Sequence, residues 1–133
     1  MANFKLRVVT PDKVFFDGEA SFITVRSIDG DIGIMANHAR YVTPLTIGTL
    51  KVKTDDGERF AAVSGGFLKT GNNMVTIVTP ACEWADEIDV ERAERAAKKA
   101  EEKLQQKQSR KEHDLEEIRL HRAINRISVA GRK

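Results

Sequence analysis

The chain has 133 residues, of which 41% are hydrophobic, and its formal net charge is +2. This length and composition are typical of one globular domain with a modest core, and the charge does not indicate a nucleic-acid-binding protein. The one cysteine, Cys82, excludes an internal disulfide framework and a zinc site built from several cysteines. The sequence has neither the ~20 consecutive apolar residues of a membrane span nor a secretory signal, so we expect a soluble, unprocessed chain.

Residues 1–85 have the period of β-strands. Apolar and polar side chains alternate over residues 4–8 and 50–53, and TDDGERF and TGNNMV between apolar runs are typical of turns. Gly57 and Asn72 or Asn73 can take the positive φ that such turns need. We therefore predict an N-terminal antiparallel β-sandwich of roughly eight to ten short strands.

Two glycine-containing stretches interrupt this pattern. In SIDGDIGIMANH, Gly30 and Gly33 favour a tight loop, and in SGGF, residues 64–67, adjacent glycines indicate a bulge or a close approach of two backbone segments. Neither stretch has the Gly-x-x-x-x-Gly-Lys-Ser/Thr pattern of a phosphate-binding loop. We interpret both as backbone geometry.

From residue 86 the period becomes helical, which divides the chain into a sandwich, 1–85, and a helical region, 86–133. Ala93, Ala96 or Ala97, Ala100 and Leu104 recur at helical spacing, and Asp89 is placed to cap this first helix. A stripe of alanines buries little apolar area, so we expect the helical region to be weakly held.

A second helix follows the polar stretch QQKQ. Ser109 and Glu112 have the spacing of a capping box, and Leu115, Ile118 (or Arg119), Ile124 and Ile127 continue a helical pattern. We predict an antiparallel two-helix hairpin that docks on the sandwich, docks on a partner, or exchanges between the two. Neither glycine nor proline separates the helices, so a continuous extended arrangement stays open.

The histidines and the cysteine do not form a catalytic or metal-binding pattern. His38 lies in a loop, and no serine or cysteine stands at a recognisable motif spacing from a histidine and an aspartate. His113 and His121 lie on a charged helix with no metal motif, which is typical of solvated surface. Cys82 lacks a neighbouring cation in the sequence that would activate its thiol. We expect no catalytic residues and no metal site.

Charged residues around the start of the first helix form the candidate binding site. Asp89 and Arg92 are three positions apart and Lys99 is seven beyond Arg92, so an acceptor and two cations can share one helical face. Arg122 and Arg126 can face them if the second helix folds back. Guanidinium groups bind phosphate bidentately and a carboxylate accepts from an exocyclic amine, which suits a nucleotide. A capped helix with solvated charges is the alternative interpretation of the same spacing.

Three longer stretches, in this order and spacing, resemble the epsilon subunit of F-type ATP synthases: DGDIGIMANHARYVTPLTIGTLKV, VSGGFLKTGNNMVTIVT and EIDVERAERA. The resemblance runs from Phe4 to about Ala130. One departure is His38-Ala39-Arg40, where the usual family loop reads His-Ala-Pro. The departure bears on the rigidity and charge of that loop.

The resemblance implies a non-catalytic central-stalk subunit of the proton-translocating ATP synthase. Its sandwich would bind the gamma subunit and the membrane ring of c subunits, peripheral to the cytoplasmic face of a bacterial cell membrane. Its hairpin would switch between a compact state and an extended state that enters the catalytic head and inhibits ATP hydrolysis. Arg119, Arg122 and Arg126 would there meet acidic segments of the beta (and alpha) subunits.

Some bacillus-type members bind ATP on the compact hairpin through Ile/Leu-Asp-x-x-Arg-Ala, which here reads IDVERA from residue 88. The resemblance thus implies ATP as a regulatory ligand that is not hydrolysed. Whether magnesium accompanies it stays open. Lys99 stands where an arginine can occur, and lysine keeps the charge but loses the planar fork. The implied contacts are Glu83, Ile88, Asp89, Arg92, Ala93, Lys99, Arg122 and Arg126.

A rival interpretation is a free-standing nucleotide or nucleic-acid binding module that uses the basic C-terminal helix. Such a module would bind polyanions generally, with steep salt dependence. The stalk interpretation instead expects no nucleic-acid partner and association with gamma.

Overall fold

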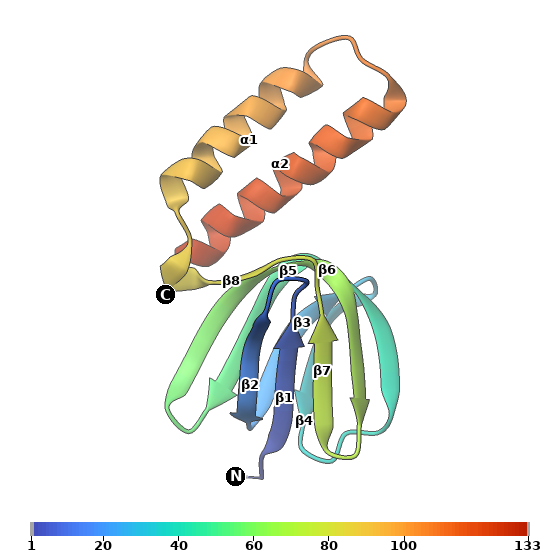
Figure 1. Ribbon diagram of the computed structural model, residues 1–133, viewed down its shortest axis with the longest axis vertical. Coiled ribbons are helices and arrows are strands. Elements are labelled where there is room, and N and C mark those ends of the chain that lie inside the picture. The colour runs from blue at the N-terminus through green and yellow to red at the C-terminus, as the bar shows by residue number, and fades with distance from the viewer. Residues whose placement is uncertain (1, 133) are drawn as a thin grey trace.

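Within residues 2–132, which the computed structural model describes, eight strands form the N-terminal part and a helical hairpin forms the C-terminal part (Figure 1). The strands are β1 (Phe4–Val9), β2 (Val14–Ala20), β3 (Phe22–Ser27), β4 (Gly30–Met35), β5 (Tyr41–Thr54), β6 (Gly57–Gly71), β7 (Met74–Val78) and β8 (Cys82–Trp84). They are followed by the 3-10 turn η1 (Ala85–Glu87) and the helices α1 (Val90–Leu104) and α2 (Arg110–Ala130). No helix in this part of the chain is long and apolar enough to cross a membrane.

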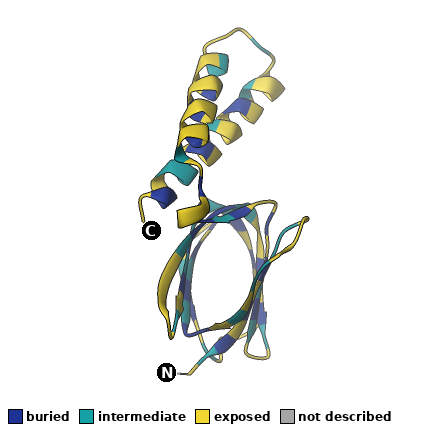
Figure 2. Cartoon of the chain, turned by 60° about the vertical axis from the view of Figure 1, so that its left-hand side comes forward, coloured by how far each residue is buried: buried dark blue, intermediate teal, exposed yellow. Residues whose placement is uncertain are grey.

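The strands form one sheet that folds over into two layers (Figure 2). The strand order is β2-β1-β7-β6-β5-β3-β4, and β8 also pairs with β6. The β1–β7 pair is parallel and the other pairs are antiparallel. The predicted β-sandwich followed by a two-helix hairpin is confirmed. Its strands are not all short, because β5 has 14 residues and β6 has 15.

Side-chain alternation fills the space between the layers. Phe4, Leu6 and Val8 of β1 are buried, whereas Lys5 and Arg7 between them are exposed. Burial of apolar surface stabilises the fold by about 25 cal/mol per Å², so this core is the main source of stability of the sandwich. The other strands contribute buried residues that include Ile23, Val25, Leu50, Val52, Leu68, Val75 and Ile77.

Strand β6 changes partners at its two adjacent glycines. Residues 61–63 pair with β8, and residues 67–71 pair with β7. Gly66 has a φ of +97°, and a Cβ atom at this position would collide with the carbonyl oxygen of Val78. The close backbone approach predicted for SGGF is therefore confirmed, and a side chain here would force β6 and β7 apart.

Both helices begin at the caps that the sequence predicts. Asp89 Oδ1 accepts a hydrogen bond from the backbone N of Arg92 at 3.0 Å. Ser109 Oγ accepts one from the backbone N of Glu112 at 3.2 Å. Each cap satisfies a backbone donor that has no partner within its own helix.

The helices pack against each other along small side chains. Ala93, Ala97 and Ala100 of α1 are buried, and so are Glu116 and Ala123 of α2. The sequence therefore predicts α2 as a helix but not the face on which it packs. Of the apolar residues that indicate α2 in the sequence, Ile127 is half-buried, whereas three are 44–50% exposed: Leu115, Ile118 and Ile124.

The base of the hairpin rests on the sandwich through a small second core. Asn125 Nδ2 adds a hydrogen bond to the carbonyl oxygen of Gly48 at 3.0 Å. The buried members of this core include three alanines, so the docked apolar area is small and the hairpin is held less strongly than the sandwich. Those members are Ala62, Ala85, Ile88, Val129 and Ala130.

Candidate functional site

An ion pair at the base of the hairpin joins two residues of the predicted site. Arg126 of α2 donates from Nε to Glu83 Oε1 at 2.6 Å and from Nη2 to Glu83 Oε2 at 3.1 Å. Strand alternation in β8 turns Glu83 away from its buried neighbours Cys82 and Trp84. The side chains of Arg126 and Glu83 are 24% and 36% exposed. This bidentate pair ties α2 to the sandwich.

The IDVERA motif both anchors α1 and presents charge. Ile88 is buried in the second core, and Ala93 is buried against α2. Asp89 and Arg92 are exposed, although Asp89 also caps the helix. A carboxylate has more acceptor positions than one cap bond uses, so Asp89 can accept a further hydrogen bond.

A buried carboxylate joins the basic residues of the two helices. Glu116 is 5% exposed, and its Oε1 accepts a hydrogen bond from Arg119 Nη1 at 2.6 Å. The same oxygen lies 3.8 Å from Lys103 Nζ on α1. Lys103 and Arg119 therefore lie on the same side of the hairpin.

Helical spacing extends this contact into a longer basic surface. Residues three, four or seven positions apart lie on one face of a helix. Positions 92, 99 and 103 of α1 follow this spacing, and so do positions 119, 122 and 126 of α2. We call this surface the basic strip, and it consists of Arg92, Lys99, Lys103, Arg119, Arg122 and Arg126.

The structure brings only part of the predicted nucleotide site into contact. Glu83 and Arg126 bind each other, whereas Arg92, Lys99 and Arg122 are exposed and have no carboxylate partner among residues 2–132. Like charges that share one surface repel, and a polyanion would relieve that repulsion. Sequence spacing predicts that these cations lie on one side of the hairpin. It misses Glu116, although the three-residue spacing of Glu116 and Arg119 was a usable signal.

His38 and Cys82 lie in surroundings that are typical of structural residues rather than catalytic ones. His38 is exposed, and its Nδ1 lies 2.9 Å from the carbonyl oxygen of Ala39. Cys82 is buried in the sandwich core. Burial, with a smaller effect of the Glu83 carboxylate, raises the pKa of the Cys82 thiol to about 12. A thiol that stays protonated is a poor nucleophile, in agreement with the sequence-based expectation.

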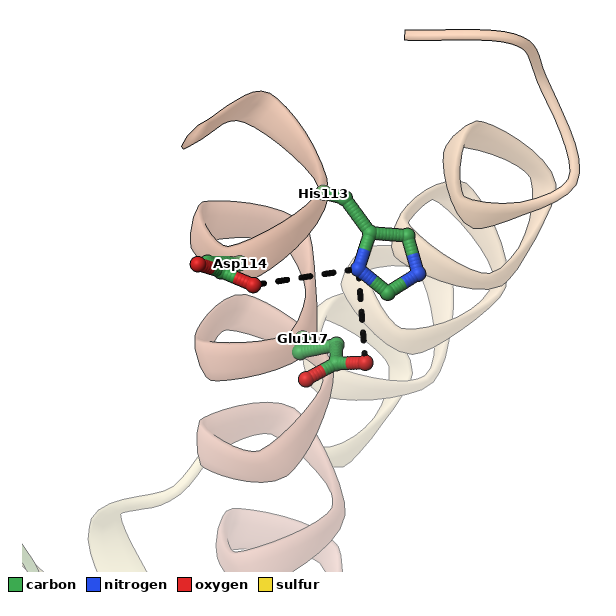
Figure 3. Close-up of side chains that lie close together, drawn as sticks. All are labelled: His113, Asp114 and Glu117. Carbon is green, nitrogen blue, oxygen red and sulfur yellow. Dashed lines mark ion pairs between the residues drawn. The ribbon is translucent and has the colours of Figure 1, made fainter. Parts of the chain in front are cut away.

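His113 lies beside two carboxylates near the start of α2 (Figure 3). Its Nδ1 is 3.9 Å from Asp114 Oδ1 and 3.4 Å from Glu117 Oε1. This group is not predicted from the sequence, although the four-residue spacing of His113 and Glu117 is typical of helical pairs. The three side chains are 44–61% exposed, so water competes for every ligand position. We interpret the group as solvated polar side chains on the surface of α2.

Two family models match consecutive parts of the chain. The model described as "ATP synthase, Delta/Epsilon chain, beta-sandwich domain" matches residues 3–85. The model described as "ATP synthase, Delta/Epsilon chain, long alpha-helix domain" matches residues 86–131. The chain belongs to the ATP synthase delta/epsilon family. The resemblance seen in the sequence is thereby confirmed.

Members of the delta/epsilon family align with the chain along its whole length. The ATP synthase epsilon chain of Ruminococcus albus is 48% identical over 134 residues and covers 100% of both chains. That of Bacillus velezensis is 41% identical over 131 residues, which are 98% of this chain and 99% of the relative.

Solved structures share the fold of the family. A chain of the Euglena gracilis mitochondrial ATP synthase, in a complex of OSCP, F1 and c-ring, has a TM-score of 0.79 and 27% identity, with coverage of 91% of this chain and 77% of that chain. A chain of the Tetrahymena thermophila mitochondrial ATP synthase, from its central stalk and c-ring, has a TM-score of 0.68 and 17% identity, with 95% of each chain covered.

Proposed function

We propose that this chain is the epsilon-type subunit of the central stalk in a proton-translocating F-type ATP synthase. The observation that carries the proposal is the match of both the sandwich and the hairpin to ATP synthase epsilon chains at 41–48% identity. The sandwich would bind the gamma subunit and the c-ring and couple them to the catalytic head. The subunit itself is non-catalytic and lies peripherally at the cytoplasmic face of the bacterial cell membrane.

An exposed apolar patch on the sandwich supports a protein partner. Val42, Phe67 and Val78 are 64%, 45% and 36% exposed. Phe67 is paired with Pro44 on one side and with Val78 on the other, and Val42 lies two residues from Pro44 on the same face of β5. Contiguous apolar residues on a soluble surface commonly mark a protein interface. We assign this patch to gamma.

Co-purification with gamma tests the stalk role. Wild-type chain is expected to be captured by tagged gamma subunit, and a Val42→Asp, Phe67→Asp variant is expected to lose capture, because two charges would be buried in the interface. Ile118→Asp on α2, where the wild-type residue is 44% exposed, is the matched control and should be captured. The rival polyanion-binding module predicts a monomer that ignores gamma and binds oligonucleotide, and that result would contradict the stalk role.

ATP is the regulatory ligand that fits the basic strip. Its phosphates would relieve the repulsion among Arg92, Lys99 and Arg122, and the free acceptor capacity of Asp89 suits the exocyclic amine of adenine. The guanidinium of Arg126 would donate hydrogen bonds both to a phosphate group and to the Glu83 carboxylate. ATP would favour the docked hairpin only through its greater affinity for that state, and loss of ATP would release α2 to inhibit hydrolysis in the catalytic head.

Calorimetry of ATP binding tests the nucleotide site. The Asp89→Asn, Arg92→Ala variant keeps a capping side chain, because Asn caps helices about as well as Asp, but it loses the carboxylate and one guanidinium. We expect it to bind ATP at least about tenfold more weakly, as each lost contact is a hydrogen bond to a charged group. Arg95→Ala, an exposed α1 residue outside the basic strip, should bind ATP like the wild type. Equal affinity in all three proteins would exclude the site.

A further inference from the structure

A cavity of about 390 Å³ lies where the base of α2 meets the sandwich. The sandwich lines it with Arg26 of β3 and Lys51 of β5, among others. The C-terminal region lines it with His121, Asn125 and Arg132. The cavity is therefore built jointly by the two parts of the molecule.

This cavity is separate from the basic strip. His121 and Asn125 are four residues apart and share one face of α2. Arg122 and Arg126 each come one residue later, which turns their side chains by about 100° around the helix axis. Arg126 accordingly points to Glu83, and neither residue lines the cavity.

The charged lining of the cavity is mostly positive. Within residues 2–132, Asp31 is the one carboxylate that lines it, and it pairs with Arg26 through an Nε to Oδ1 distance of 3.0 Å. Lys51 Nζ lies 2.8 Å from Glu58 Oε2, but Glu58 is outside the lining. Both pairs are solvent-exposed, and exposed pairs hold their partners weakly, so Arg26 and Lys51 are available to an anion.

Arg132 and neutral donors complete the lining. No carboxylate pairs with Arg132 in the part of the chain that the structure describes, and its guanidinium carbon lies 5.7 Å from the centre of the Phe60 ring. Asn125 uses one amide hydrogen for the carbonyl oxygen of Gly48, and an amide carries a second one. The hydroxyl of Thr49 also lies in the lining. Donors of several kinds thus surround a space large enough for a small solvated anion.

We propose that this cavity binds a small multivalent oxyanion, of which inorganic phosphate is the simplest example. Lys51 and Arg132 supply charge-assisted hydrogen bonds, and Asn125 supplies a neutral one. Because α2 and the sandwich both line the cavity, the anion is fully held only while α2 is docked, and its binding stabilises that state. The site goes beyond the nucleotide role of the basic strip and does not depend on it.

Titration of the full-length chain with inorganic phosphate tests the site. Ionic strength is held constant with chloride, and binding is followed by calorimetry. Lys51→Gln and Arg132→Gln are each expected to weaken phosphate binding about tenfold, because each removes a charge-assisted hydrogen bond. Lys98→Gln, an exposed residue of α1 outside the cavity, makes the same change in net charge and should keep wild-type affinity.

The Asp89→Asn, Arg92→Ala variant, in which the proposed ATP site is weakened, shows whether the cavity binds free phosphate only or also the phosphate end of a nucleotide. If ATP competes with inorganic phosphate in this variant, the cavity also binds the phosphate end of a nucleotide. If ATP does not compete, free phosphate is the occupant. Either result supports an oxyanion site. Equal phosphate affinity in the wild type and in the Lys51→Gln and Arg132→Gln variants would overturn it. So would a phosphate titration that matches chloride alone. If ATP does not bind to the basic strip, these outcomes for the cavity are unchanged, so the ATP site and the oxyanion site are tested independently.

Discussion

Burial determines the chemistry of Cys82. The sequence shows only that no cation stands next to it, whereas the structure shows that the thiol lies in the sandwich core, where desolvation raises its pKa to about 12. A buried thiol of this kind contributes packing rather than reactivity.

The raised pKa of Cys82 predicts a loss of stability at alkaline pH. The unfolded thiol ionises near its ordinary pKa of 9.0, while the folded thiol stays neutral up to about 12. The unfolded state therefore releases a proton first, so the stabilisation is complete below pH 9.0 and is lost as the pH rises towards 12. Urea denaturation between about pH 8 and pH 11 should show a steeper fall in the free energy of unfolding for the wild type than for Cys82→Ala. Identical slopes would contradict this prediction.

Residues with a local chemical role were predictable from the sequence. Gly57, Asn72 and Asn73 take positive φ because turn geometry demands it, and Asp89 caps α1 because its side chain reaches a nearby backbone donor. Glu116 was not predictable as a buried residue, because its burial depends on α1 and on Lys103 across the hairpin. Of the candidate site, spacing predicts the shared face of the cations, but the pairing of Arg126 with Glu83 across 43 positions needs the fold.

At the scale of elements, α2 was predicted as a helix and its packing face was not. Its apolar residues are spread around the helix: Leu120 and Ile127 are half-buried on the side of Ala123, whereas Leu115, Ile118 and Ile124 are exposed. The alanine surface of α1 selects the face with Ala123, because helices with small side chains can approach closely. Leu115 and Ile118 are consequently left exposed in the docked hairpin.

We expect the Glu83–Arg126 pair to hold α2 on the sandwich. A double-mutant cycle with Glu83→Gln and Arg126→Ala should give a coupling energy of about 1 kcal/mol, since the pair is bidentate but partly exposed. Hydrogen exchange of α2 amides is the measurement, because opening of the docked base exposes them. The Lys51–Glu58 pair, at 2.8 Å within the sandwich sheet, is the control and should leave α2 exchange unchanged when Glu58 is replaced by Gln. A coupling energy of zero for Glu83 and Arg126 would show that the pair does not hold α2.

The whole molecule combines a large core with a small docking surface. The core between the two layers ends at Trp84, and residues beyond it belong to the second core or to the hairpin. The proposed switch between a docked and an extended hairpin would therefore leave the core of the sandwich closed.

Removal of the hairpin tests regulation by the whole subunit. A chain truncated after residue 88 keeps every residue of the main core, so we expect it to fold and to be captured by gamma. The complex reconstituted with it should hydrolyse ATP faster than the complex with full-length chain, because the inhibitory helix is absent. A full-length Arg119→Ala, Arg122→Ala variant keeps α2 but lacks two of its positive charges, so it distinguishes the effect of the charges from the effect of removing the helix. Unchanged hydrolysis by the truncated complex would count against an inhibitory hairpin.

The parallel pairing of β1 with β7 also fixes the order in which the molecule folds. Lys5 pairs with Met74, so the first strand must wait for a segment some seventy positions later before its edge is filled. The hairpin needs only neighbouring segments, and contacts between near segments form much faster than distant strand pairings. During synthesis the sandwich is therefore complete only when β7 and β8 have emerged, just before the helices follow. If the hairpin switches as proposed, α1 and α2 would separate and re-form without repeating that slow closure.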